Sequence, residues 1–311
     1  MDIKPLVTII TPVYNREKYI EEVILSVLNQ DYPNIEYIVL DDGSTDNSLE
    51  IIKKYKNRIT YISHDNIGET LTVNKGFNQA SGEIIGIVNS DDPLYPNAIS
   101  KMVEYFNKNK NIIVAYPDWD MIDENGQVIQ NIKTYDYNFI NMVRWHHCMP
   151  GPGTFFKKEL LEKLKGRDIG YKYVADFDFW LRVGLIGDFA RVPFTLATFR
   201  QHNDSASVKS KGCLMAQEHI KLINKFYSLP NLPNEIIKIK KEAYSSANFI
   251  AFCTIGEGYY LKKFSYPIKA FLLIPKKYFF EYKSRLKIIL KWLLSNILYR
   301  IIKKLRKWMN I

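Results

Sequence analysis

Residues 35–46 read Ile-Glu-Tyr-Ile-Val-Leu-Asp-Asp-Gly-Ser-Thr-Asp, a short apolar run that ends in an acidic, glycine-containing turn. Two other apolar runs, Leu6–Ile10 and Ile84–Val88, end in polar loops in the same way. Between the runs, apolar residues recur at steps of three and four, as in Lys18–Gln30, which predicts amphipathic helices. Repeated strand–loop–helix units of this size predict an α/β fold, in which helices flank a mostly parallel, Rossmann-like sheet.

The same reading predicts further elements along the chain, and residues 206–275 look helical. The additional predicted strands are 59–63, 112–116, 118–129 with a turn at Asn125-Gly126, 151–156 as a short extended piece, and 194–199, and the additional predicted helices are 48–55, 70–80, 158–164 and 176–185.

Three loops are candidates for a ligand site, because ligands bind beyond the carboxyl ends of parallel strands. They are Thr11–Arg16, Asp41–Asp46 and Asn89–Pro93. The first lacks the GxGxxG pattern of dinucleotide-binding folds, and the chain contains no Gly-Lys pair of a P-loop, so both of these classes are excluded. Carboxylates in place of glycines suggest that a divalent cation neutralises any phosphate that binds here.

The composition is that of an ordinary folded protein. The 311 residues are 47% hydrophobic and 24% charged, which excludes a collagen, a coiled-coil rod and a disordered chain. The three cysteines are far apart, so neither a disulfide framework nor a cysteine zinc site is expected. With no secretory signal recognisable at the N-terminus, we expect a cytoplasmic protein.

The net charge of +10 is concentrated in the C-terminal tail. Residues 282–311 carry nine Lys and Arg and no acid, so the rest of the chain is nearly neutral and nucleic-acid binding is not expected. Apolar residues from Arg285 to Trp308 recur at helical spacing, and the longest uncharged run, Trp292–Tyr299, is far shorter than the about 20 residues that span a bilayer. We expect an amphipathic helix on the inner face of an anionic membrane; a helix packed on the protein or a partner is the alternative.

Five motifs together resemble family-2 glycosyltransferases with the GT-A fold, over roughly residues 5–207. They are Val7-Thr-Ile-Ile-Thr-Pro-Val-Tyr-Asn-Arg16, Ile38-Val-Leu-Asp-Asp-Gly-Ser-Thr-Asp46, Asn74-Lys-Gly-Phe77, Gly82-Glu-Ile-Ile85 and Asn89-Ser-Asp-Asp92. The resemblance implies a nucleotide-diphosphate sugar as donor and transfer with inversion at the sugar. We expect a catalytic domain at residues 1–207, with a nucleotide-sugar half at about 1–100 and an acceptor half at about 101–207. A helical extension is expected at residues 208–275 and a basic amphipathic tail at residues 276–311.

The resemblance also assigns a donor site. Asp91 and Asp92 match the sugar-nucleotide and metal motif, with Asp92 as a ligand of Mg²⁺ or Mn²⁺ and His202 as a further ligand or a diphosphate donor. A turn that caps the following helix is the alternative for the two aspartates, and a structural histidine for His202. The remaining residues that the resemblance places around the nucleotide sugar are Pro12, Val13, Tyr14, Asn15, Asp42, Asn66, Lys75 and Asn89.

Two of these positions depart from the pattern in relatives. Many relatives have Asp where this chain has Asn89, which can bind the nucleotide only through its amide. They also have Arg at the position of Val73, so Lys75 is the candidate replacement cation, with a solvated helix lysine as the alternative.

Asp176 is the candidate general base. The family pattern Glu-Asp-x-x-Leu-x-x-Arg corresponds to residues 175–182, where Ala175 replaces the Glu and Arg182 keeps its offset. An inverting transfer needs such a base at the acceptor hydroxyl. Asp178 is the rival, and capping of the helix N-terminus is the structural alternative.

Three functions remain open from the sequence, and the least favoured is nucleic-acid binding through the basic tail, which would weaken steeply with salt and survive loss of Asp92. The first is a metal-dependent inverting hexosyltransferase that builds surface polysaccharide on a saccharide or lipid-linked saccharide acceptor. The second is a catalytically silent nucleotide-sugar binding or scaffold subunit, which the missing Glu at position 175 allows.

Overall fold

The computed structural model describes residues 4–202, 212–255, 260–274, 284–285 and 287–292. Residues 1–143 and 147–210 form one compact unit, and residues 144–146 and 211–311 form a second. The domain borders expected at residues 100, 207 and 275 remain predictions.

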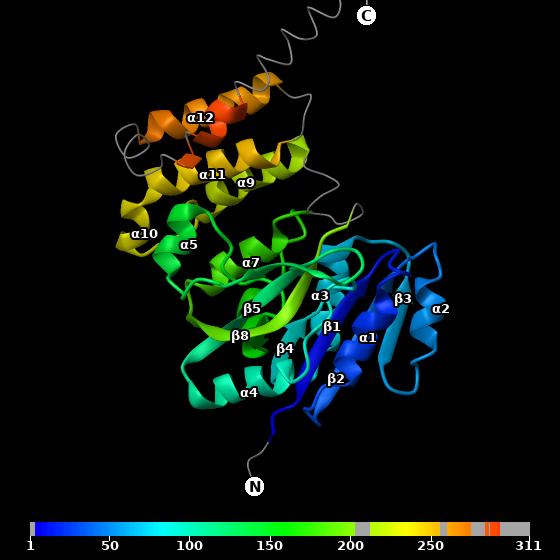
Figure 1. Ribbon diagram of the computed structural model, residues 1–311. Helices are drawn as coiled ribbons and strands as arrows, with labels where there is room; N and C mark the ends of the chain where they lie inside the picture. Colours follow the sequence, from blue (N-terminus) through cyan, green and yellow to red (C-terminus); the bar gives the residue numbers. More distant parts are fainter. Residues whose placement is uncertain (1–3, 203–211, 256–259, 275–283, 286, 293–311) are drawn as a thin grey trace, which may run out of the picture. The chain divides into compact units, whose positions relative to one another are not determined.

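The first unit is built on one eight-stranded sheet (Figure 1). Its strands run in the order β3-β2-β1-β4-β7-β5-β6, and β8 also pairs with β5. The strands are β1 (Val7–Val13), β2 (Ile35–Asp42), β3 (Thr60–His64), β4 (Ile84–Ile87), β5 (Ile112–Ile122), β6 (Val128–Ile132), β7 (Phe155–Lys157) and β8 (Asp188–Arg200).

The predicted mostly parallel sheet is confirmed. The pairs β1–β2, β1–β4, β2–β3 and β5–β8 are parallel. Strand β7 pairs antiparallel with β4 and β5, and β6 pairs antiparallel with β5. All seven residues of β1 are buried, as expected of a central strand that is covered on both faces.

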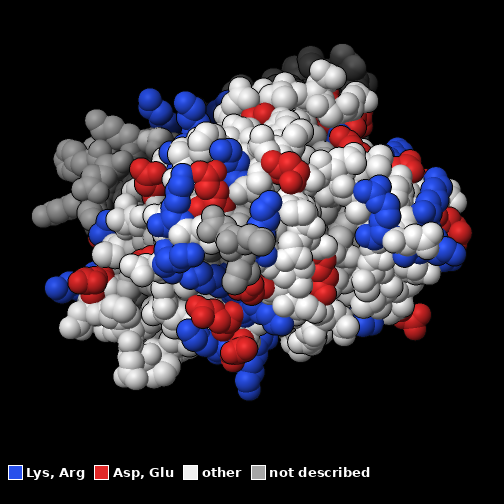
Figure 2. Space-filling view, turned by 90° about the horizontal axis from the view of Figure 1, so that it is seen from below, with Lys and Arg blue, Asp and Glu red and all other residues white. Residues whose placement is uncertain are grey.

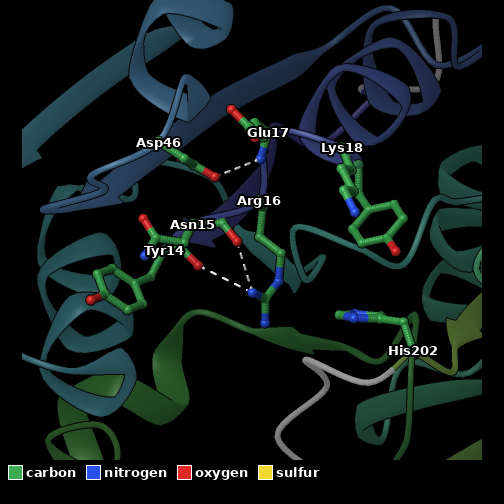
Figure 3. Close-up of a pocket in the computed structure, with 8 residues that line it drawn as sticks. Tyr14, Asn15, Arg16, Glu17, Lys18, Asp46 and His202 are labelled. Atoms are coloured by element: carbon green, nitrogen blue, oxygen red, sulfur yellow. Dashed lines mark hydrogen bonds between the residues drawn. The ribbon is translucent and has the colours of Figure 1, made fainter.

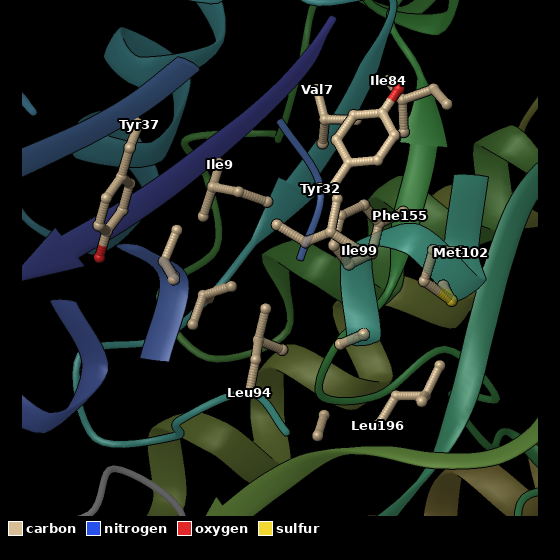
Figure 4. Close-up of a cluster of buried hydrophobic side chains, with 14 of the residues drawn as sticks. Val7, Ile9, Tyr32, Tyr37, Ile84, Leu94, Ile99, Met102, Phe155 and Leu196 are labelled. Carbon is tan, nitrogen blue, oxygen red and sulfur yellow. The ribbon is translucent and has the colours of Figure 1, made fainter. Parts of the chain in front are cut away.

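Helices cover both faces of this sheet. They are α1 (Ile20–Leu28), α2 (Ser48–Lys53), α3 (Glu69–Gln79), α4 (Ala98–Lys108), α6 (Glu159–Leu164) and α7 (Ala175–Val183), and α5 (Phe139–Trp145) crosses from the first unit into the second. On one face, side chains of α1 and α4 pack with Val7 and Ile9 of β1 in a continuous core (Figure 4). On the other face α3 approaches so closely that a Cβ at Gly76 would lie 2.6 Å from Cγ2 of Ile10.

Three expectations need correction. The helix α4 was not predicted, although Ile99, Met102, Val103 and Phe106 have helical spacing and are all buried. The predicted strands 112–116 and 118–129 are largely one strand, β5, because a register shift between Pro117 and Asp118 accommodates the proline. β8 begins six residues before the predicted start, at Asp188.

Charges of both signs are mixed on one face of the molecule. On the face seen in Figure 2, basic and acidic side chains alternate over short distances. Such a surface has no extended field of one sign on this face.

The second unit is helical, as the reading of residues 206–275 predicts. Its helices are α9 (Cys213–Phe226), α10 (Asn234–Lys238), α11 (Lys240–Thr254) and α12 (Tyr260–Leu273). Ala247 and Ala251 are small buried residues on α11, and Ala251 packs in a core with Phe252 and Ala270. Within the described residues, no helix has both the length and the apolarity needed to cross a membrane.

Most of the predicted tail helix lies outside the described residues. Residues 284–285 and 287–292 are helical, Ile289 is buried against the core of the second unit, and Arg285 donates to Ser246 Oγ at 3.0 Å. These residues pack on their own unit. For them alone, the structure favours the alternative of a helix packed on the protein over a membrane contact.

Two buried histidines of the second unit predict an acid-sensitive packing. His146 Nε2 and His219 Nδ1 lie 3.0 Å apart, and burial lowers the pKa of His219 to about 4 and that of His146 well below its usual value. In the unfolded chain both histidines take up protons near pH 6.5, so folding stability is fully present above that pH and is lost as pH falls toward 4.

We therefore expect His219→Leu to make the thermal unfolding midpoint of this unit less sensitive to pH between 7.5 and 4.5. Circular dichroism melts of both proteins at the two pH values measure this. An equal loss in wild type and variant would show that other groups cause the acid sensitivity.

Candidate functional site

The loops after β1 and β2 are joined by hydrogen bonds. Asn15, in the left-handed region with φ 51°, accepts from Thr45 N–H at 2.8 Å, and its own N–H donates to Ser44 Oγ at 3.0 Å. Glu17 N–H donates to Asp46 Oδ2 at 3.1 Å. The two loops are adjacent because their parallel strands end at the same edge of the sheet.

A cavity of about 510 Å³ opens at this edge (Figure 3). Its lining residues are Tyr14, Asn15, Arg16, Glu17, Lys18, Tyr19, Asp46 and His202. Of the four residues predicted in the first loop, Tyr14 and Asn15 line this cavity, whereas Pro12 and Val13 are buried within β1. His202 comes from the far end of the unit and meets the first loop only through tertiary folding.

Asp42 organises the loop that follows β3. Its Oδ1 accepts from Ile67 N–H at 2.7 Å and its Oδ2 from Gly68 N–H at 3.0 Å, while Asn66 Nδ2 donates to the Asp42 backbone carbonyl at 3.0 Å. Asp42 is buried. In this structure the Asp42 carboxylate holds the loop before α3. Any influence of Asp42 on a bound nucleotide would therefore be exerted through the position of that loop.

The two aspartates after β4 have different surroundings. Asp92 is buried; its Oδ1 accepts from Arg200 N–H at 2.8 Å and its Oδ2 from Asn89 Nδ2 at 3.0 Å. Asp91 is partly exposed, and its Oδ2 lies 2.9 Å from His202 Nε2 and 3.2 Å from Arg16 Nε. Asp91 and His202 thus place two potential metal donors next to each other, and Asp92 fixes the strand that leads to His202.

The charge of Asp92 is disfavoured. Burial, reinforced by the neighbouring Asp91 carboxylate, raises the pKa of Asp92 to about 8. In this structure both oxygens of the carboxyl group accept hydrogen bonds from within the protein, from Arg200 and Asn89.

Arg200 ties the site together. Its guanidinium donates to the carbonyl oxygens of Asp91, Asp123 and Glu124 and to Glu22 Oε2, and it stacks on the Tyr19 ring at 4.9 Å. The side chain is 1% exposed. Arg200 therefore secures the backbone of the Asp91 loop from behind rather than reaching a ligand.

The acceptor-side carboxylates lie on α7. Asp176, in its first turn, is partly exposed, and its Oδ1 accepts from Phe177 N–H at 2.7 Å. Asp178 is buried and forms an ion pair with Arg182, with Nε and Oδ2 2.8 Å apart. Of the two candidates for the base, Asp176 alone combines solvent access with freedom from an ion pair among the described residues.

A carboxylate that the sequence did not single out lies between these two ends. Burial raises the pKa of Glu69 at the start of α3, and the negative charges of Asp176 and Asp91 raise it further, while Arg167 opposes the rise. Its side chain is 57% exposed. Glu69 follows Gly68, which donates to Asp42 Oδ2 at the end of β2, and precedes Thr70, which donates to the Tyr171 carbonyl in the segment before α7.

Other residues named from the sequence have separate positions. Lys75 lies on α3 and is partly exposed. Asn74, quoted only as part of a motif, accepts from Arg167 N–H and donates to the Arg167 carbonyl, both at 2.8 Å. Burial raises the pKa of the Cys148 thiol well above its usual value, so this group near Asp176 is neutral.

Sequence reasoning missed Arg16, Arg200, Glu69 and Arg167. The first directly follows Asn15 and the second stands two residues before His202, so proximity to a motif was a usable signal for both. Glu69 and Arg167 are 98 residues apart, and no local pattern links them. Among the described residues, no group of three or more His, Cys, Asp or Glu is arranged to hold a metal by itself.

The chain belongs to glycosyl transferase family 2, whose family model matches residues 8–165. An uncharacterized glycosyltransferase of Methanocaldococcus jannaschii is 28% identical over 291 residues, which are 87% of this chain and 89% of that protein. The fold is of the GT-A type, so the predicted family and fold class are both confirmed.

Two solved structures share this fold. A mannosyltransferase from Pyrobaculum calidifontis, in complex with GDP-Man and Mn²⁺, has a TM-score of 0.61 at 17% identity and covers 99% of this chain and 84% of that chain. Residues 1–349 of S. aureus TarS, in complex with UDP-GlcNAc, have a TM-score of 0.58 at 17% identity and cover 88% of this chain and 91% of that chain.

Proposed function

We propose that this glycosyltransferase moves a hexose-type sugar, with inversion, from a nucleotide-diphosphate sugar to a saccharide or lipid-linked saccharide in surface polysaccharide synthesis. The observation that carries the proposal is the contact of Asp91 Oδ2 with His202 Nε2, 2.9 Å apart, beside the cavity that His202 lines. On the acceptor side, Asp176 at the start of α7 is the accessible candidate base. A leaving group at one end and a base at the other are what an in-line displacement requires.

The donor end suits a divalent cation. Asp91 Oδ2 and His202 Nε2 lie 2.9 Å apart, and a carboxylate with an imidazole, completed by diphosphate oxygens and water, is a set that Mn²⁺ accepts. The complex of the Pyrobaculum mannosyltransferase with GDP-Man and Mn²⁺ supports this. We therefore propose that Asp91 and His202 hold Mg²⁺ or Mn²⁺, with Asp92 supporting them; when bound, the cation would stabilise charge on the leaving diphosphate.

The chain's own residues act around that group. Arg16, 3.2 Å from Asp91, is placed to bind diphosphate oxygens once a cation replaces it at that carboxylate. The cavity at Tyr14 and Asn15 is the proposed nucleotide pocket. Asp176 would take the proton of the acceptor hydroxyl at its carboxylate.

Binding of the donor with metal tests this site. We expect wild type to bind either UDP-GlcNAc or GDP-mannose in calorimetric titrations with Mn²⁺, and to bind it far more weakly without the ion. Asp91→Ala should lose the metal-dependent part, an effect of at least the about 10- to 100-fold that loss of a group supporting a metal ligand costs.

Asp92→Asn is the matched comparison, because it keeps the side-chain shape beside the same loop. We expect it to keep metal-dependent binding, since in the structure its oxygens serve Arg200 and Asn89. Loss of that binding in Asp92→Asn together with its retention in Asp91→Ala would return the metal to Asp92. Absence of nucleotide binding in wild type would refute the proposed donor site.

The acceptor side of the proposal rests on the sequence. Membrane contact through the basic tail, and with it a peripheral position at the inner membrane face, stays a prediction drawn from the nine Lys and Arg of residues 282–311.

A further inference from the structure

Glu69, at the start of α3, and Arg167, in the segment before α7, form an ion pair. Arg167 Nη1 lies 3.4 Å from Glu69 Oε1. The Arg167 side chain is 10% exposed, and its Nε hydrogen is buried without a hydrogen-bond partner among the described residues. A buried guanidinium N–H that lacks a partner costs free energy unless a ligand or water accepts from it.

The backbone that carries Arg167 is held rigidly. Asn74 pairs with both the N–H and the carbonyl of Arg167 at 2.8 Å. Arg182 donates to the carbonyl oxygens of Leu164 and Gly166 at 3.0 and 2.8 Å. Gly166 has φ 80°, and a Cβ there would lie 2.6 Å from Asn74 Oδ1, so the chain passes directly against α3.

The position of the pair follows from the chemistry of the proposed function, on which this inference rests. In an inverting displacement the acceptor attacks opposite the leaving group, so the transferred sugar lies between the diphosphate and the base. Glu69 begins α3 directly after Gly68, whose N–H donates to Asp42 Oδ2 at the end of β2 at 3.0 Å. The next residue, Thr70, donates through Oγ1 to the carbonyl of Tyr171, shortly before α7 and its first-turn Asp176, at 3.1 Å. Glu69 therefore lies between the site edge of the sheet and the segment that leads to the candidate base, which is where we expect the sugar.

We propose that Glu69 and Arg167 bind the ring hydroxyls of the donor sugar and select a neutral sugar over one that carries a carboxylate. A carboxylate accepts from two neighbouring hydroxyls, and a guanidinium N–H donates to a hydroxyl oxygen, so together they match a pair of adjacent hydroxyls. The carboxylates of Glu69 and Asp176 carry two negative charges, and the guanidinium of Arg167 carries one positive charge. This excess of negative charge disfavours binding of an anionic sugar.

The test compares each sugar nucleotide with its free nucleotide. Calorimetry with Mn²⁺ would measure the Kd of UDP, GDP, UDP-GlcNAc, UDP-glucose, GDP-mannose and UDP-glucuronic acid for wild type, Glu69→Gln and Arg167→Met. Glu104→Gln is the matched control, because Glu104 also pairs with cations, Lys101 and Lys108, but on the surface of α4. Thermal melts identify any variant that fails to fold.

We expect Glu69→Gln to weaken binding of the preferred neutral sugar nucleotide by about tenfold or more, the usual cost of removing one partner of a charged hydrogen bond. The Kd of the free nucleotide should stay unchanged, and discrimination against UDP-glucuronic acid should narrow. Arg167→Met should weaken the same sugar nucleotide, and Glu104→Gln should behave as wild type.

Three results would overturn the inference. The first is an unchanged affinity of Glu69→Gln for the sugar nucleotide. The second is an equal loss of affinity for the free nucleotide, which would place Glu69 at the diphosphate. The third is a wild-type preference for UDP-glucuronic acid. Failure of wild type to bind any nucleotide would instead refute the proposed function, so the two failures are distinguishable.

Discussion

Asp176→Asn is expected to lower turnover by about 10²- to 10⁴-fold, the usual contribution of a positioned general base, without changing the affinity for the nucleotide sugar. The amide keeps the size of the side chain and can still accept from Phe177 N–H, as the carboxylate does at 2.7 Å. It cannot take the proton from an acceptor hydroxyl. Binding and turnover are thereby separated in one substitution.

The measurement is donor turnover with acceptor present, alongside calorimetric binding of the donor. Asp46→Asn is a suitable control, because Asp46 is a carboxylate that lines the nucleotide cavity at a different loop. It should change binding more than the rate at saturating donor. Full turnover in Asp176→Asn would eliminate this residue as the base, and a wild type that binds the donor but never turns it over would favour the silent subunit.

Asp178→Ala is expected to destabilise the first unit by about 3 kcal/mol, because removing one partner leaves the other charge of a buried pair uncompensated. Asp178 is 4% and Arg182 16% exposed in their side chains, and the two lie 2.8 Å apart. Arg182 also holds the carbonyl oxygens of Leu164 and Gly166, so the loop that carries Arg167 should loosen with it.

Urea or thermal unfolding measures this loss, and a decrease of roughly 6–12 °C in the midpoint is expected for a unit of this size. Lys108→Ala is the comparison, since its ion pair with Glu104 is solvent-exposed and contributes little to stability. If Asp178→Ala were as stable as wild type and lacked turnover, Asp178 would take the place of Asp176 as the candidate base. The pair of variants therefore separates the two aspartates by opposite effects.

Much of the fold follows from local periodicity. The run from Ile35 to Leu40 and its acidic turn predict β2 and the site loop after it, because a buried parallel strand is apolar throughout and must end in polar residues at the sheet edge. Apolar residues with helical spacing are also present in Ile99–Phe106, so the sequence contains enough information to predict α4. The single strand β5 was not, because whether a strand continues through Pro117 depends on the bulge in its pairing with β8.

The motifs of the donor site were readable as residue types, but their division of labour was not. Asp91 and Asp92 are neighbours in sequence, and only the packing of Arg200 shows that Asp92 is desolvated and already bonded within the protein. The partnership of Asp178 with Arg182 lay within reach of the sequence, because residues four apart face each other on a helix.

By itself the sequence determined the family, the parallel α/β architecture, the loops that hold the site and the candidacy of Asp91, Asp92, Asp176 and His202, because strands, helices and motifs are properties of short stretches. The tertiary structure decided which carboxylates are accessible and which residues meet. Burial, pKa and contacts such as that between Glu69 and Arg167 depend on segments that are distant along the chain and come together only when the sheet and its helices pack.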